Sequence, residues 1–293
     1  MSRHSGSHMI VALGTIAAAL ALKLAYSRAG ANELLWVLAP SCQLARLAGV
    51  ELHYESGAGF ISHSRHLVVG PACAGVNFLV AAWLALYFGL QARQPDTRRK
   101  LQWSALSLLS AYAVTLLVNG VRIWLAAHLY ELELYGALLT KTRAHALLGV
   151  VLYCGALLVL CQLAALRCAG RLRRDDQART LASAGCERAA RGHAALPSAL
   201  QPQAIQPVSA TSPIGAQASH APKSQPSAAN LARRAFGVYL GVVLGLPLLN
   251  RAYLHDPARF VEHALLTAGT GALVLLAFTA VLHGAARFTG RRA

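Results

Sequence analysis

The sequence predicts an all-α integral membrane protein with about six transmembrane helices and a small outward-facing loop or β-hairpin cap. Of its 293 residues, 56% are hydrophobic and only 13% are charged, whereas charged residues make up about 25% of an ordinary soluble protein. The apolar residues also gather in long runs without charge, each about as long as the ~20 residues that a membrane-spanning helix needs. Composition and run length together argue against a soluble enzyme.

Six apolar runs predict the membrane spans. The second, third and fourth contain no Lys, Arg, Asp or Glu, whereas the first contains Lys23 and the fifth is short and interrupted by Pro247. The first run lacks a convincing small-residue cleavage site, which favours a retained helix over a removed signal peptide. The runs are Met9–Leu24, Leu67–Leu90, Leu101–Val121, His145–Leu166, Phe236–Leu254 and Ala264–His283.

Two shorter segments separate the first and second spans. Leu34–Leu44 is apolar but contains Pro40, and we expect it to lie along the membrane interface rather than to cross. Val50–Ile61 alternates partly between apolar and polar residues and is broken by Gly57 and Gly59, which predicts a small outward-facing β-hairpin. Such a cap would suit an extended peptide held near the membrane surface.

The basic residues predict the topology. The chain has 27 Lys and Arg against 11 Asp and Glu, a balance that suggests nucleic-acid binding in a soluble protein. Here the basic residues flank apolar runs, in Gln91–Lys100 and Arg167–Arg174, and such loops are cytoplasmic as a rule. We therefore expect the lipid bilayer as a partner and no nucleic acid, with Tyr26–His66 and Ala126–Ala144 on the outer side.

Composition divides the chain into three parts. Residues 171–232 are rich in Ala, Ser, Pro, Gln and Arg. They carry too few bulky apolar side chains for burial to offset the entropy lost on folding, which predicts a disordered cytoplasmic linker. Residues 1–170 would form the membrane catalytic core of an enzyme. Residues 233–293 are expected to form a separate C-terminal transmembrane hairpin.

Three reactive side chains from separate spans are predicted to lie at the same depth. Counted from the cytoplasmic ends of their spans at ~1.5 Å per residue, Cys73, Arg122 and His145 lie roughly 26, 32 and 32 Å above the cytoplasmic interface. Because the hydrocarbon core is ~30 Å thick, all three are expected near its outer boundary. Pro71 favours a helix start that places Cys73 within the first turn.

These residue types suit acyl transfer by a cysteine nucleophile. A neutral His145 can take the thiol proton and later protonate a leaving amine, and Arg122 can hold an oxyanion or a carboxylate. Asn77 and Asn119 can orient the pair or bind substrate, and Gly75 permits close approach of another backbone. The same residues also fit structural roles, because a membrane cysteine packs as a small apolar residue and boundary Arg and His side chains reach the headgroups.

Three segments resemble, in order and spacing, the signature blocks of the exosortase/archaeosortase family. They are Pro71–Leu79 (PACAGVNFL), Asn119–Ile123 (NGVRI) and His145–Gly149 (HALLG). The resemblance covers roughly residues 9–170 and looks most like the exosortase K branch. It implies an integral-membrane cysteine transpeptidase or protease that cuts a C-terminal sorting signal, of the PEP-CTERM kind, from exported proteins.

The same resemblance assigns roles to the three reactive residues. It makes Cys73 the nucleophile, Arg122 the transition-state or substrate-binding cation and His145 the general base, at the periplasmic face of a bacterial inner membrane. No cofactor and no metal is expected. Ala74 departs from the serine of many members, the core has fewer spans than larger relatives, and the linker and C-terminal hairpin lie outside the family pattern.

The alternative is a non-enzymatic polytopic membrane protein, either a small transporter or a partner in envelope assembly. A transporter would be expected to carry polar residues near the bilayer midplane, often in broken helices of paired repeats. The second to fourth spans are instead apolar at mid-depth, which favours chemistry near the membrane surface.

Other polar residues form weaker patterns. Three cysteines recur every seven residues without a nearby His or acid, which favours packing, and three outward histidines lack a cysteine or acid to complete a zinc ligand set. These residues are Cys154, Cys161, Cys168, His53, His63 and His66. His128 and Arg143 are the alternatives to the histidine and arginine assigned above, and Glu131 and Glu133 fit a solvated loop face.

Overall fold

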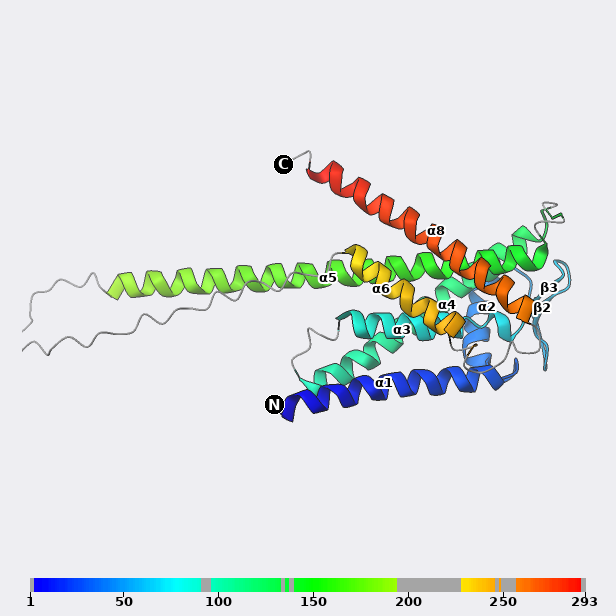
Figure 1. The fold of residues 1–293 in the computed structure, drawn as a ribbon, viewed down its shortest axis with the longest axis horizontal. Helices are drawn as coiled ribbons and strands as arrows, with labels where there is room; N and C mark the ends of the chain where they lie inside the picture. The colour runs from blue at the N-terminus through cyan, green and yellow to red at the C-terminus, as the bar shows by residue number, and fades with distance from the viewer. Residues whose placement is uncertain are drawn as a thin grey trace, which may run out of the picture. The chain divides into compact units, whose positions relative to one another are not determined.

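The computed structural model describes residues 3–90, 96–132, 135–136, 140–193, 228–245, 248 and 257–290. Most of them are helical, and a small sheet lies at the end of the bundle where α5 and α8 begin (Figure 1). The elements are α1 (Arg3–Arg28), α2 (Leu35–Leu47), β1 (His53–Glu55), β2 (Gly59–Ser62), β3 (Leu67–Val69), the 3₁₀ turn η1 (Pro71–Cys73), α3 (Val76–Leu90), α4 (Thr97–Leu129), α5 (Lys141–His193), α6 (Ala228–Leu240), the π-helical turn η3 (Gly241–Gly245) and α8 (Pro257–Gly290).

Five helical segments in the described part of the chain are long and apolar enough to cross a membrane. They are Met9–Arg28, Pro71–Gly89, Thr97–Leu129, Lys141–Arg167 and Phe260–Leu282, and they correspond to the first four and the last of the predicted spans. The fold is therefore helical and compatible with a membrane, as the composition predicts. The number of spans differs from the predicted six.

The predicted span Phe236–Leu254 accounts for the difference. Helix α6 has 13 residues, or about 20 Å at ~1.5 Å per residue, and it ends in the π-helical turn Gly241–Gly245. Glycine is a weak helix former, and one glycine stands at each end of this turn. Residues 246–247 and 249–256, which include Pro247, lie outside the described residues.

The predicted span Leu67–Leu90 begins later than expected. Residues 67–69 form strand β3, Pro71 opens the turn η1, and α3 starts only at Val76. The amide of Cys73 donates to the carbonyl oxygen of Gly70 (2.9 Å), and Gly75 has φ +72°, a left-handed conformation that breaks the helix and favours glycine. Cys73 consequently lies in the 3₁₀ turn that Pro71 opens at the start of the segment Pro71–Gly89, and it precedes the α-helical part of that segment.

The predicted β-hairpin is present, and β3 extends it to three antiparallel strands in the order β1-β2-β3. Phe60 pairs with both Tyr54 and Val69. Gly59 has φ +108°, and a Cβ atom there would lie 2.5 Å from the carbonyl oxygen of Val69, so only glycine fits. The Tyr54 hydroxyl donates to Oδ1 of Asn32 (2.7 Å), which ties the sheet to the turn between α1 and α2.

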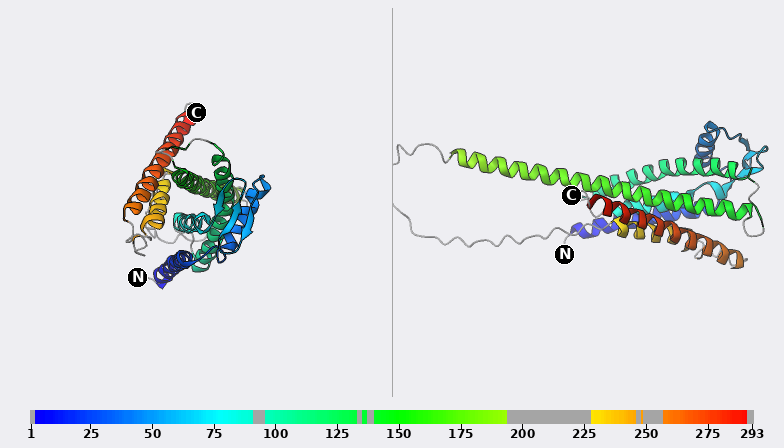
Figure 2. Two further views of the ribbon diagram at one scale, coloured as in Figure 1. Left: turned by 90° about the vertical axis from the view of Figure 1, so that its right-hand side faces the viewer. Right: turned by 90° about the horizontal axis from the view of Figure 1, so that it is seen from above.

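Helix α3 forms the centre of the bundle. It contacts α1, α4 and α6 (Figure 2), and its Phe78 and Tyr87 are fully buried. Helix α2, expected as an interfacial segment, continues through Pro40 and lies against α4. The two approach so closely at Gly120 that an added Cβ atom would lie 2.9 Å from the Cβ atom of Leu44.

The C-terminal helices pack against the rest of the bundle. Helix α6 contacts α3, and α8 contacts α6. An added Cβ atom at Gly271 would lie 2.6 Å from the ring of Phe236 and 3.4 Å from Sγ of Cys154. Residues Met1–Ala165 and Ser227–Ala293 accordingly form one compact unit, and the predicted C-terminal hairpin 233–293 lies within it.

The second unit, Leu166–Pro226, begins inside α5. This helix continues to His193, which corrects the predicted linker 171–232 over its first 23 residues. The reason is local, because residues 171–193 are rich in Ala and Arg and contain no proline. Ala and Arg favour helix even where the segment has little to bury. Residues 194–227 lie outside the described part.

Substituting Gly120 tests the packing of α2 on α4. We expect Gly120→Ala to destabilise the protein by about 1–3 kcal/mol, as overpacking does, because the new methyl group meets the side chain of Leu44 and backbone of Ser41. Thermal unfolding of the detergent-purified protein measures this. Gly155→Ala is the matched control, since no atom lies within 4 Å of its added Cβ; equal midpoints for the two variants would contradict the packing.

Candidate active site

The structure brings Cys73, His145 and Arg122 together from η1, α5 and α4. Sγ of Cys73 lies 3.4 Å from Nε2 of His145, and Nη2 of Arg122 lies 2.8 Å from the same nitrogen. Cys73 and Arg122 are each 6% exposed, and His145 is half-buried. The imidazole therefore contacts both the thiol and the guanidinium in a largely enclosed cluster.

Glycine at position 149 makes room for the guanidinium beside α5. A Cβ atom on Gly149 would lie 3.0 Å from Nε and 3.3 Å from Cζ of Arg122. The planar guanidinium thus rests directly against the helix backbone, one turn after His145. A larger side chain at this position would displace the arginine from the imidazole.

Tyr153 and Asn119 complete the surroundings of Arg122. Nη1 of Arg122 donates to the Tyr153 hydroxyl (3.2 Å), and that hydroxyl donates to Oδ1 of Asn119 (2.9 Å). The guanidinium carbon also lies 5.4 Å from the centre of the Tyr153 ring, within the range of a cation–π contact. Arg122 is consequently held at two of its nitrogens and over an aromatic face.

Hydrogen-bond roles define the resting state of the imidazole. A guanidinium only donates, so Nε2 of His145 accepts from Arg122 and the proton of the neutral ring is on Nδ1. Nδ1 of His145, Nε of Arg122 and Nδ2 of Asn119 are buried and have no hydrogen-bond partner among the described residues. Three polar groups of the cluster thus remain available to another molecule.

Gly75 and Asn77, which follow the turn Pro71–Cys73, contact different neighbours. A Cβ atom on Gly75 would lie 3.1 Å from the Tyr153 hydroxyl and 3.6 Å from Cγ of Asn119, so this glycine lets the Cys73 turn meet the arginine network. Asn77 does not join that network. Its Oδ1 accepts a hydrogen bond from Nζ of Lys23 on α1.

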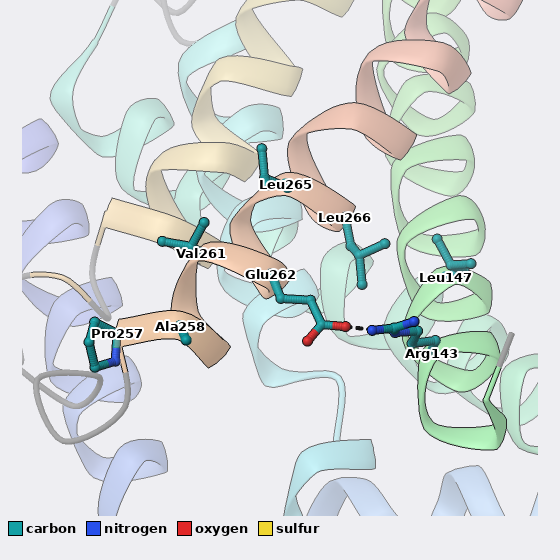
Figure 3. A pocket seen from close by; sticks show the side chains of 8 residues that line it. All are labelled: Arg143, Leu147, Pro257, Ala258, Val261, Glu262, Leu265 and Leu266. Atoms are coloured by element: carbon teal, nitrogen blue, oxygen red, sulfur yellow. Dashed lines mark hydrogen bonds and ion pairs between the residues drawn. The ribbon is translucent and has the colours of Figure 1, made fainter. Parts of the chain in front are cut away.

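Arg143 and His128 are separated from the cluster. Nε of Arg143 lies 2.7 Å from Oε1 of Glu262 in an apolar groove of about 730 Å³ between α5 and α8 (Figure 3). Arg143 and Leu147 line this groove, and helical spacing puts His145 on the opposite face. His128 donates from Nδ1 to the carbonyl oxygen of Trp124 in its own helix (2.9 Å).

The remaining polar residues singled out by sequence lie elsewhere. Cys154 and Cys161 are buried and free, and the side chain of Cys168 is outside the described residues. The exposed His63 pairs with Glu55 (3.2 Å). Within the described ranges no three His, Cys, Asp or Glu side chains could hold a metal ion together. Glu131 pairs with Arg65 (3.3 Å), and Glu133 lies outside the described ranges.

Sequence reasoning missed Tyr153, Gly149 and Tyr130 as parts of the cluster. Gly149 and Tyr153 follow His145 by four and eight residues, a spacing that puts them on one helix face and could have indicated them. Tyr130, just beyond α4, packs its ring 6.3 Å from that of His145. Burial raises the pKa of Tyr130, so its phenol stays neutral beside the imidazole.

Comparison of the chain with protein-family models, with curated proteins and with solved structures gives no match. The case for a function therefore depends on the geometry of the cluster.

Removing the imidazole tests the contact with the thiol. We expect His145→Ala to slow alkylation of Cys73 by iodoacetamide at least about tenfold, because the thiolate reacts and the variant lacks the acceptor 3.4 Å from Sγ. Mass mapping of the Cys73 peptide over time measures the rate. His128→Ala, which removes a histidine bonded only within its helix, should react at the wild-type rate; equal slowing in both variants would contradict a specific role.

Proposed function

We propose that this protein is a membrane-embedded cysteine transpeptidase or protease of the exosortase type. The observation that carries the proposal is the contact of Cys73 and Arg122 with one nitrogen of His145, although the three residues are separated by 49 and 23 positions. A nucleophile within reach of a base that is oriented by a third group is the arrangement of covalent acyl-transfer catalysis.

The residues divide the reaction as follows. The guanidinium of Arg122 first turns from Nε2 of His145 toward the substrate carbonyl oxygen, which frees the lone pair of Nε2. Sγ of Cys73 then attacks the carbonyl carbon of the scissile peptide bond while its proton passes to Nε2 of His145, and Arg122 stabilises the oxyanion that forms. The C–N bond then breaks, the leaving amine takes the proton from His145, and a thioester remains on Cys73.

The second half of the reaction regenerates the thiol. Water or an acceptor amine attacks the thioester and loses its proton to His145, and Cys73 leaves as the thiol when that proton returns to sulfur. Water gives hydrolysis and an amine gives transpeptidation. Both outcomes use the same three side chains.

The proposed substrate is an exported protein with a C-terminal sorting signal. The basic loops support a cytoplasmic position for the end of the bundle opposite the sheet, and the cluster lies at the beginning of α5 and just after β3. The proposed site consequently faces the periplasm of a bacterial inner membrane. An extended peptide from an exported protein would approach it from that side.

Substitution of the nucleophile is the direct test. We expect Cys73→Ala to abolish cleavage of an exported reporter that ends in a short motif, an apolar helix and a basic tail, with the variant still present in membranes on an immunoblot. Cys42→Ala should cleave normally, because burial raises the pKa of Cys42 to about 12 and this thiol is inert at neutral pH. Full cleavage by Cys73→Ala would refute the proposal.

Tyr153→Phe tests the placement of Arg122. The variant keeps the ring but removes the hydroxyl that binds Nη1 of Arg122, and we expect kcat to fall about tenfold with little change in KM, as for the loss of one hydrogen bond to a charged group. Tyr112→Phe is the matched control, because it removes a hydroxyl that donates a 2.7 Å hydrogen bond to the carbonyl oxygen of Trp36, away from the cluster. This variant should keep the wild-type kcat. A wild-type kcat in Tyr153→Phe would contradict this role.

A further inference from the structure

Helix α1 makes two hydrogen bonds to the segment around Cys73. The Tyr26 hydroxyl donates to the carbonyl oxygen of Pro71 (3.2 Å), and Nζ of Lys23 donates to Oδ1 of Asn77. These two bonds bracket Cys73, since Pro71 precedes it by two residues and Asn77 follows it by four. Lys23 and Tyr26 are three residues apart and share one face of α1.

Lys23 carries a charge that packing alone does not explain. It is 6% exposed in a helix that is apolar enough to cross a membrane, and no carboxylate among the described residues pairs with it. Its ammonium contacts the Asn77 amide and lies 5.1 Å from the centre of the Tyr26 ring. An ionisable residue within a membrane span is costly and usually serves function.

The lysine fixes the orientation of the Asn77 amide. An ammonium has three donors and no acceptor, so Asn77 must turn Oδ1 toward Lys23 and its Nδ2 group away from it. Asn77 is half-buried, in contrast to the fully enclosed Val76 and Phe78 beside it. Its two N–H donors are therefore held in a constant direction at a partly open position of the first turn of α3.

This position lies within reach of a bound peptide. A chain extends at most ~3.6 Å per residue, so the Cα atoms of Asn77 and Cys73 are at most about 14 Å apart. An extended substrate covers that distance in about four residues. A main-chain carbonyl of such a substrate would match a fixed amide donor.

We propose that Nδ2 of Asn77 donates a hydrogen bond to a main-chain carbonyl of the substrate within about four residues of the scissile bond, and that Lys23 is the positioning residue that holds Asn77 for this contact. The proposal rests on the acyl-transfer function proposed above. It adds a peptide-binding subsite on the α1 side of Cys73, away from the arginine network.

The variant Asn77→Asp tests whether Asn77 binds the peptide or only supports the fold around Cys73. The carboxylate keeps the size of the side chain and still accepts from Lys23, but it has no N–H donor and repels a substrate carbonyl. The probes are iodoacetamide and a tetrapeptide chloromethyl ketone, both reacting with Cys73 in membranes of the full-length protein and quantified by mass mapping. We expect KI for the tetrapeptide reagent to rise about tenfold, the effect of one lost hydrogen bond, with the iodoacetamide rate unchanged within about twofold.

Lys23→Met provides the second variant, because it keeps the length of the side chain and removes the donor. KI should rise about threefold or more, again without a change in the iodoacetamide rate. Three results would overturn the subsite. The first is a wild-type KI in Asn77→Asp, and the second is an equal change in the reaction with both reagents. The third is a reaction of the wild-type protein with the tetrapeptide chloromethyl ketone that does not saturate. Cleavage by Cys73→Ala, a separate measurement, would instead overturn the proposed function.

Discussion

The buried guanidinium of Arg122 is the constraint around which the cluster is built. Enclosing an unpaired charge in an apolar bundle costs several kcal/mol, so its donors need partners that packing holds in place. The Tyr153 hydroxyl and Nε2 of His145 provide two such partners, and Gly149 lets the guanidinium lie against the backbone of α5. The contacts of this one side chain therefore link α4 to α5.

The same constraint extends to Cys73. Tyr153, while bound to Arg122, stacks on Phe78 with ring centres 5.0 Å apart and planes 15° apart. Its hydroxyl also lies so close to Gly75 that an added Cβ atom there would be 3.1 Å from it. The first turn of α3 is thus aligned with the arginine network, and its Asn77 also accepts a hydrogen bond from Lys23 of α1. Cys73, just before this turn, has its sulfur 3.4 Å from Nε2 of His145.

Surrounding apolar helices strengthen this arrangement. Hydrogen bonds in a low-dielectric interior are stronger than in water, and unpaired polar groups there are more costly. Nε of Arg122 and Nδ2 of Asn119, which have no hydrogen-bond partner within the described part of the chain, would gain partners from a peptide carbonyl or its oxyanion in the proposed reaction. An enclosed cluster with unused donors is accordingly suited to charge that develops only during a reaction.

Sequence by itself determined the helical, membrane-compatible fold and the hairpin, because run length and residue alternation depend only on local geometry. It also predicted a common depth for Cys73, Arg122 and His145 from the helical rise. Only the tertiary structure decided that Tyr153 and Lys23 join the site, that α3 begins after Cys73, and that α6 and α8 pack on the core. Helical periodicity defines which residues share a face, but which faces meet depends on side-chain packing between segments far apart in the chain.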